Sequence, residues 1–371
     1  MEPAAGALVA AGALVPAKRA GASVVHLRAH WFIAARSREL RHAPVATTLF
    51  GTPIVLFRGK DGKAGALLDR CPHRNVPLSL GQVSDGTLRC PYHGWQFDTG
   101  GACTHIPSLP SERAGDVKAR RAHALPTLEQ QGFIWVYSAP SQDEQDPSTM
   151  PSSVPHRFAT MGHRDYTTVV QSVVAPGTMY STIENALDVP HTAFLHRGLF
   201  RAESRGLTIT AKVRRTSDRV EAEYVGEPRP PGLIGRILSP SGGTVTHFDR
   251  FILPSIAQVE YSIGAENHIL VDSVMTPVSD FVTRIYAVVS FRTRVPHFLV
   301  RPFVKPLALR VFQQDAFILA KQTETIRAFG GEQFASTEID VLGRHIWRLL
   351  KQAERGDEHG GEESAEVELV V

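Results

Sequence analysis

Two short stretches shape the fold of this chain: Cys71-Pro72-His73, and Cys90-Pro91-Tyr92-His93, which opens the run CPYHGWQFDTGG. Each stretch brings one thiol and one imidazole, and 16 residues separate His73 from Cys90. Neither pair is long enough to surround a metal alone, so two loops must close on one site from opposite sides. The prolines suit rigid loop tips. The pattern predicts a metal site held between two loops of one small domain.

The spacing bears on which metal is bound. In a Rieske [2Fe-2S] cluster, two thiolates hold one iron and two imidazoles hold the other. A structural zinc site also takes two Cys and two His, but usually as one C-x2-C pair and one H-x3-5-H pair. Because each loop here mixes the two ligand types, we predict a Rieske cluster on Cys71, His73, Cys90 and His93, with zinc as the alternative.

Length and cysteine usage set the broad class. A chain of 371 residues exceeds what one hydrophobic core usually organises, which favours two domains. Beyond the two cluster cysteines only Cys103 remains, a bystander in this interpretation, so no disulfide framework is expected and a cytoplasmic location is predicted.

The two ends of the chain differ in charge. Residues 1–22 are rich in Ala and Gly, but Glu2 stands where a signal peptide carries basic residues, so we expect a disordered arm. No run approaches the roughly 18 apolar residues of a membrane-spanning helix, and none is expected. From residue 354 onward, seven acidic residues and one basic residue, Arg355, give a net charge of −6. Because the whole chain carries a net charge of +3, residues 1–353 carry +9. We expect 354–371 to be a disordered acidic tail.

Between these ends the chain divides at 141–155, where Pro, Ser and charged residues predict a linker. Residues 23–140 read as a small antiparallel β domain, with strands such as Thr52–Arg58 and Gly132–Tyr137 between Gly and Pro turns. Residues 156–353 read as an α+β domain, an antiparallel sheet with helices on one side. Its strand candidates are Thr167–Val174, Leu207–Val213, Val220–Val225, Ala257–Ile263, Ile269–Met275 and Thr283–Phe291.

The second domain carries its own metal pattern, in Glu184–His196. A mononuclear non-haem Fe(II) that activates oxygen needs two imidazoles and one carboxylate, and His191 and His196 can supply the imidazoles. Five residues of an ideal helix leave this pair about 140° apart, so the backbone must bend for both to reach one ion. Pro190 can start that bend.

Together, C-x-H-x16-C-x2-H and N-x-x-D-x-x-H-x4-H resemble the oxygenase (alpha) subunit of the Rieske non-haem iron oxygenases, over about residues 25–350. The N-x-x-D spacing is more similar to vanillate O-demethylase, dicamba demethylase, 3-ketosteroid 9α-hydroxylase and pheophorbide a oxygenase than to the naphthalene-type dioxygenases. The resemblance implies an N-terminal Rieske domain followed by a helix-grip (START-like) catalytic domain.

The resemblance also implies a third iron ligand, an Asp on a late helix. Asp315 fits, because it interrupts an apolar helical stretch and a buried carboxylate needs a cation or strong hydrogen bonds. The alternatives are a surface Asp, an ion pair with Arg310, or Glu324 or Asp280 as the ligand instead.

Asp188 and Asn185 are the remaining candidate catalytic residues. Asp188 lies three residues before His191 and can orient that ring. The resemblance adds a second role, linking His191 to a cluster histidine, here His93, of an adjacent subunit in a ring, most often a trimer. Asn185 can approach the iron or substrate, or make an ordinary polar helix contact.

The activity that the resemblance implies is O2-dependent oxidation of a hydrophobic small molecule. No nucleotide fingerprint is found, so NAD(P)H would act only through a partner ferredoxin or flavin reductase; no nucleic acid partner is expected. Two alternatives remain: a Rieske electron carrier, or a second domain that binds a ligand without iron. The side chains considered for an apolar substrate pocket, or equally for the core, are Phe194, Phe200, Phe251 and Val274.

Overall fold

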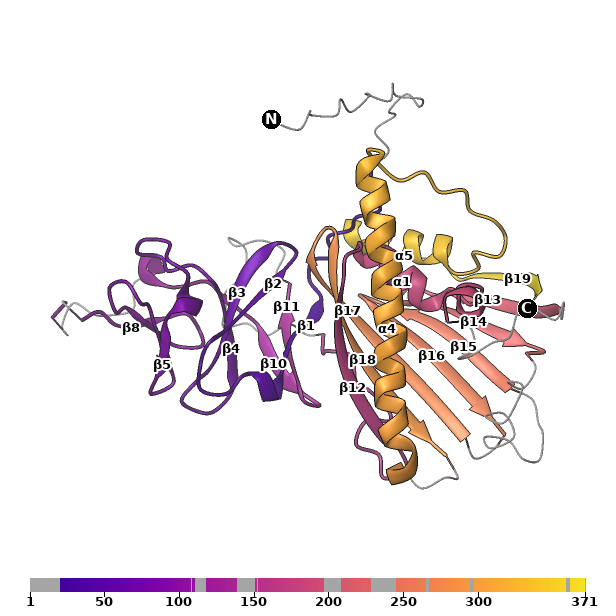
Figure 1. Cartoon of the computed structure of the whole chain (residues 1–371). Helices are drawn as coiled ribbons and strands as arrows, with labels where there is room; N and C mark the ends of the chain where they lie inside the picture. The colour runs from indigo at the N-terminus through magenta and orange to yellow at the C-terminus, as the bar shows by residue number, and fades with distance from the viewer. Residues whose placement is uncertain are drawn as a thin grey trace, which may run out of the picture.

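The computed structural model describes residues 21–107, 109–110, 118–138, 151, 153–196, 208–227, 245–264, 267–293, 297–357 and 361–370. In Figure 1 a smaller β region, coloured indigo to magenta, lies beside a large sheet crossed by helices. Most of the expected N-terminal arm and linker lie outside the described residues.

The first region is an antiparallel β domain, as predicted, with sheet orders β1-β11-β10, β2-β3-β4-β9 and β5-β6-β7-β8. Aromatic and β-branched runs form its strands; β11, with the sequence FIWVY, is buried along its whole length. The strands are β1 Trp31–Arg36, β2 Val45–Leu49, β3 Thr52–Arg58, β4 Ala64–Leu68, β5 Gln82–Ser84, β6 Thr87–Arg89, β7 Gln96–Phe97, β8 Cys103–His105, β9 Ala124–Leu125, β10 Thr127–Gln130 and β11 Phe133–Tyr137, with 3-10 turns at Ser37–Glu39, Leu78–Leu80 and Lys118–Arg120.

Of the two Cys–His loops, the first follows β4 of the second sheet and the second joins β6 to β7 of the third. Both cysteines belong to a separate small core, whose other buried members include Phe57, Leu67, Leu88 and Phe97. Gly101 closes the turn between β7 and β8 with φ +79°, and a Cβ there would lie 2.0 Å from the Ala122 carbonyl oxygen. Only glycine fits this position.

The second region is one eight-stranded antiparallel sheet, ordered β12-β18-β17-β16-β15-β14-β13-β19. Neighbouring strands are joined mostly by short hairpins, and β17 pairs with β18 from His268 opposite Arg292 to Ser279 opposite Val282. The strands are β12 Thr167–Ala175, β13 Thr208–Arg215, β14 Arg219–Val225, β15 Val245–Ile252, β16 Ile256–Ile263, β17 Asn267–Ser279, β18 Val282–Arg292 and β19 Glu363–Val370.

The two faces of this sheet have different partners, because alternate side chains point to opposite sides. Met275 joins the core beneath the helices. Val274, the next residue along, packs with Trp135 and Phe158 on the side of the first domain. A hydrogen bond from Thr276 Oγ1 to the Ile33 carbonyl, 2.8 Å long, links the two domains at this junction.

In the part of the chain that the structure describes, helices cover one face of this sheet only, which confirms the predicted α+β class. They are α1 Met179–Leu187, α2 His191–Leu195, α4 His297–Ala328 and α5 Gly343–Arg355. The long helix α4 runs across the sheet (Figure 1) and packs along β12. The side chain of Thr178 caps the start of α1 by accepting a hydrogen bond from the Ser181 amide. No helix in the described ranges is long and apolar enough to cross a membrane.

The prediction of a disordered acidic tail over 354–371 was wrong where the tail is described. Strand β19 pairs with β13 along its whole length. Its exposed glutamates alternate with side chains that turn toward the core, and Leu369 is 2% exposed. Glu366 lies opposite Lys212, which offsets its charge. The alternation of inward and outward side chains along β19 therefore mattered more for its structure than the net charge of the tail. The prediction of disorder had been based on that net charge.

Candidate metal centres

The two Cys–His loops are closed by their own backbone. In the first loop the Cys71 amide donates to the Val76 carbonyl at 2.9 Å, and in the second the Cys90 amide donates to the Trp95 carbonyl at 2.8 Å. One loop follows β4 and the other joins β6 to β7. Each loop therefore holds its cysteine in place before any metal binds.

The four predicted cluster residues meet at one place. Both thiols are buried, and burial, helped by the neighbouring Cys90 thiol, raises the pKa of Cys71 to about 11. The rings of His73 and His93 lie 4.5 Å apart, centroid to centroid. Nδ1 of His73 is buried without a hydrogen-bond partner among the described residues. Two buried thiols and two imidazoles at one place, one of them with an unpartnered ring nitrogen, suit a metal centre at this position, so the residues fit a Rieske cluster.

Aromatic rings surround the histidine side of this centre. The Trp95 ring stacks on His73 at 4.7 Å and 6°. The Tyr92 ring lies 3.9 Å from that of His93 and is 62% exposed. The imidazole edge of the centre therefore reaches the protein surface. Strands β5 and β8 of the same sheet lie at the end of the first domain that points away from the large sheet (Figure 1).

The second centre is built where the chain breaks between two helices. Helix α1 ends at Leu187, three residues follow, and α2 begins at His191. His196 stands just outside α2, with φ −103° and ψ 35°. The bend predicted from the spacing is thus present, before the first histidine and again at the second. It allows both rings to face one point.

Asp315 of α4 completes this group. Nε2 of His191 lies 3.3 Å from Nε2 of His196. Oδ1 of Asp315 lies 3.1 Å from Nε2 of His196 and 3.6 Å from Nε2 of His191. The three ligand atoms lie within 4.8 Å of one another. This is the set of two imidazoles and one carboxylate that the sequence predicted.

The hydrogen bonds around the rings show why this group needs a cation. Nδ1 of His191 faces the Asp188 carbonyl, and Nδ1 of His196 faces Oε1 of Gln314 at 3.0 Å. Because both carbonyls accept, each ring carries its proton on Nδ1 and presents a lone pair at Nε2. Oδ1 of Asp315 is buried and accepts no hydrogen bond from the described residues.

Three lone pairs thus converge on one point. The residues fit a divalent metal with two neutral imidazoles and one carboxylate, the ligand set of non-haem iron sites.

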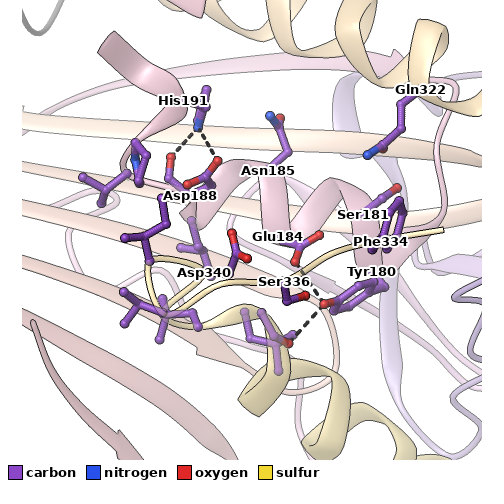
Figure 2. Close-up of a pocket in the computed structure, with 18 of the residues that line it drawn as sticks. Tyr180, Ser181, Glu184, Asn185, Asp188, His191, Gln322, Phe334, Ser336 and Asp340 are labelled. Carbon is purple, nitrogen blue, oxygen red and sulfur yellow. Dashed lines mark hydrogen bonds and ion pairs between the residues drawn. The ribbon is translucent and has the colours of Figure 1, made fainter. Parts of the chain in front are cut away.

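Asp188 lies on the other side of His191. One oxygen of its carboxylate stands 3.7 Å from Nδ1 of His191, and its side chain is 38% exposed. It faces a cleft of about 760 Å³ beside α1 and α4, which Asn185 also lines. Figure 2 shows Asp188 beside His191. In the same cleft the Tyr180 hydroxyl donates a hydrogen bond to Glu184 Oε1 at 3.1 Å. The structure thus places Asp188 between the candidate metal site and the protein surface.

Several other predicted residues lie elsewhere. Glu324 is 63% exposed and pairs with Lys321, while Asp280 is 52% exposed and pairs with His26, so neither is a ligand.

The apolar residues considered for a pocket also separate. Phe251 and Val274 are buried in core clusters, and Val274 is on the face away from the helices. Phe194 lines the cleft and is 80% exposed. Phe200 lies outside the described residues. Gln314 was missed, and its only signal in the sequence is its place beside Asp315.

Comparisons with known proteins agree with both centres. A model of the Rieske [2Fe-2S] domain matches residues 30–129, and one of the vanillate O-demethylase oxygenase C-terminal domain matches residues 178–356. The chain is 34% identical over 190 residues to chlorophyllide a oxygenase of Arabidopsis thaliana, covering 51% of this chain and 32% of that protein. It is 31% identical over 241 residues to the oxygenase component of dicamba O-demethylase of Stenotrophomonas maltophilia, covering 64% and 61%. Both matches span less than two thirds of the relative.

The fold matches a crystal structure of dicamba monooxygenase bound to dicamba, with a TM-score of 0.76, 22% identity and coverage of 90% of this chain and 99% of that one. At that identity the match speaks for the fold alone. Taken with the two domain models and the ligand sets described above, these relatives show that the chain belongs to the Rieske oxygenases, with a Rieske domain followed by a vanillate O-demethylase-type oxygenase domain.

Proposed function

We propose that the protein catalyses the O2-dependent oxidation of a hydrophobic small molecule at a mononuclear Fe(II), with electrons supplied through the Rieske cluster. The observation that carries this proposal is the convergence of His191, His196 and Asp315 on one point. When bound, the cluster supplies one-electron transfer and the mononuclear iron supplies dioxygen activation. The reaction would be hydroxylation, demethylation or a related oxidation.

The class of substrate is proposed from the relatives. The names of several relatives and matching structures cite dicamba, 3-chlorobenzoate and caffeine, all small ring compounds. A compact ring compound with a mainly apolar body is therefore the first class to test. Incubating the protein with a promiscuous reductase and a panel of such compounds, followed by mass spectrometry, would identify a product. Only two irons per chain, with no oxidised product from any compound, would favour an electron carrier whose second domain only binds a ligand.

The proposed partner is the protein that delivers electrons to the cluster. A ferredoxin or flavin reductase would carry the electrons from NAD(P)H. The three cysteines form no disulfide, which suits a reducing compartment such as the cytoplasm.

The route between the two centres runs, in our proposal, from one subunit to the next. Within one chain the cluster loops lie in the domain on the far side of the sheet from α1 (Figure 1). The cleft beside Asp188 is acidic, with Glu184 and Asp340 in its lining. The first cluster loop carries exposed Arg74, and exposed Arg89 ends β6 just before the second loop. This complementarity favours docking of one chain's cluster loops in the cleft of another, in a ring such as a trimer.

Asp188→Asn tests this route. The change keeps the shape but removes the charge that would join His191 to His93 of the neighbouring chain. We expect both iron sites to stay filled while reoxidation of the reduced cluster in a single turnover becomes very slow. Asp280→Asn, a matched change at an exposed aspartate outside the cleft, should leave that rate nearly unchanged. If Asp188→Asn instead loosens the iron by about 10- to 100-fold and excess Fe(II) restores activity, Asp188 only orients His191. A strictly monomeric active protein would also contradict the proposal.

A further inference from the structure

The surroundings of His196 are unlike those of His191. The Nδ1 atom of His191 faces a backbone carbonyl, which any residue at position 188 would provide. The Nδ1 atom of His196 faces a side chain, the amide oxygen of Gln314, at 3.0 Å. The acceptor at Nδ1 of His191 is therefore independent of side-chain identity, whereas the acceptor at Nδ1 of His196 is a side chain from another helix.

The backbone around His196 does little to fix its ring. Helix α2 has only five residues and ends at Leu195, so His196 lies beyond the last helical position. Its side chain is only 2% exposed, so bulk water cannot readily replace a lost partner at Nδ1. An unpaired buried N–H is costly, and the ring would be free to rotate or to move its proton to Nε2. Either change would remove the lone pair that faces Asp315.

Gln314 and Asp315 approach His196 from two sides. They are consecutive on α4 and therefore project about 100° apart around the helix axis. Asp315 places Oδ1 3.1 Å from Nε2 of His196, while Gln314 places its amide oxygen 3.0 Å from Nδ1. One turn of helix thus supplies a ligand and also fixes which nitrogen of the neighbouring ligand faces the metal.

We propose that Gln314 is a positioning residue of the mononuclear site, which holds His196 in the Nδ1–H form so that Nε2 can bind metal. This inference rests on the proposed function, because it takes His191, His196 and Asp315 to be the metal ligands. Gln314 is not among the residues that line the cleft beside Asp188. Its neutral amide holds His196 without adding a second negative charge beside Asp315.

The test measures metal affinity in the full chain with its cluster intact, after a chelator has removed the mononuclear metal. Co(II) is the probe, and the amount bound at a series of free Co(II) concentrations gives the affinity. Gln314→Leu should weaken Co(II) binding by about 10- to 100-fold, the usual loss when a hydrogen bond to a ligand is removed. Gln314→Glu keeps an acceptor at the same distance and should bind Co(II) at least as tightly as wild type. Gln313→Leu, a change at the exposed neighbour on the same helix, should leave binding unchanged.

Two further readings separate positioning from a general loss of structure. The cluster spectrum and the melting temperature should be the same in all three variants. The proposal is overturned if Gln314→Leu binds Co(II) like wild type, if Gln313→Leu weakens binding equally, or if Gln314→Glu fails to restore it. If the wild-type protein takes up no Co(II) that depends on His191 and Asp315, the proposed function itself fails, and that result is distinct from the others.

Discussion

The two metal centres are built in opposite ways. The cluster residues lie in two short loops of the first domain, and each loop is closed by hydrogen bonds among its own residues. The mononuclear group joins a five-residue helix to a distant long helix, and Gln314 lies 118 positions after His196 in the chain. The cluster site thus depends on local turns, whereas the mononuclear site depends on the whole second domain. Substitutions at the cluster site should therefore affect that site alone. Substitutions at the mononuclear site should show effects from residues that are far apart in the sequence.

The largest expected effect is loss of the cluster. Cys71→Ser removes one of two thiolates, so the [2Fe-2S] centre should not assemble and activity should be abolished. The red-brown colour and the Rieske-type EPR signal of the reduced protein should disappear, while the mononuclear iron stays. Cys103→Ser is the matched control, since Cys103 is buried in the same small core but is not a cluster residue. Equal loss of signal in both variants would mean that general packing, and not ligation, holds the cluster.

Loss of the mononuclear site should leave the cluster intact. Asp315→Ala removes one of three ligands, so iron should fall from about three to about two per chain while the cluster spectrum persists. Iron analysis and EPR on the same sample measure both. Glu324→Ala, at the exposed rival carboxylate, should keep full iron. Full iron and activity in Asp315→Ala would show that the carboxylate ligand is another residue.

The second domain should also respond to pH through a buried histidine. His247 is 1% exposed and bonds to Glu227 at 2.7 Å and to Asp249 at 3.0 Å, between the stacked rings of Tyr224 and Tyr261. Burial alone would lower its pKa, but the two carboxylates outweigh burial and raise the pKa to about 9.

The folded protein therefore favours charged His247, and this stabilisation is complete below pH 6.5 and is lost as pH rises through about 9. It corresponds to roughly 3 kcal/mol of unfolding free energy. His247→Gln should lack this pH dependence. We would follow thermal unfolding of wild type and variant from pH 6 to pH 10. A stability gap between them that stays constant across that range would mean that His247 does not titrate in this window.

The smallest effect is expected at the start of α1. Thr178→Ala removes the hydroxyl that accepts from the Ser181 amide at 3.0 Å, which should cost about 1 kcal/mol of unfolding free energy. Thr178→Ser keeps the acceptor and should lose less. Because α1 leads to Asp188, a loss of activity in Thr178→Ala at a temperature where the variant is fully folded would show that the cap also positions the cleft.

The same contrast explains what could be predicted from the sequence. The cluster residues were predictable because each Cys and its His lie within one short loop, so the spacing alone shows which side chains belong together. Strand β15 was missed because its inward side chains include His247 and Asp249, so hydrophobic alternation is interrupted. Strand β19 was hidden by its acidic residues.

The mononuclear site was predictable only in part. The spacing of His191 and His196 predicted a bend, but Asp315 was chosen through the family resemblance. Gln314 could not be found at all, since its role depends on how α4 is packed against α2. Contacts between distant helices are set by the tertiary structure and leave no local pattern.

The central claim is that one chain carries two different iron sites. Its most direct test is iron and acid-labile sulfide measured on the same purified sample, before and after treatment with an Fe(II) chelator. We predict about three irons and about two sulfides per chain before treatment, and about two of each afterwards, because only the mononuclear iron has open coordination positions. One zinc per chain with no labile sulfide would contradict the account.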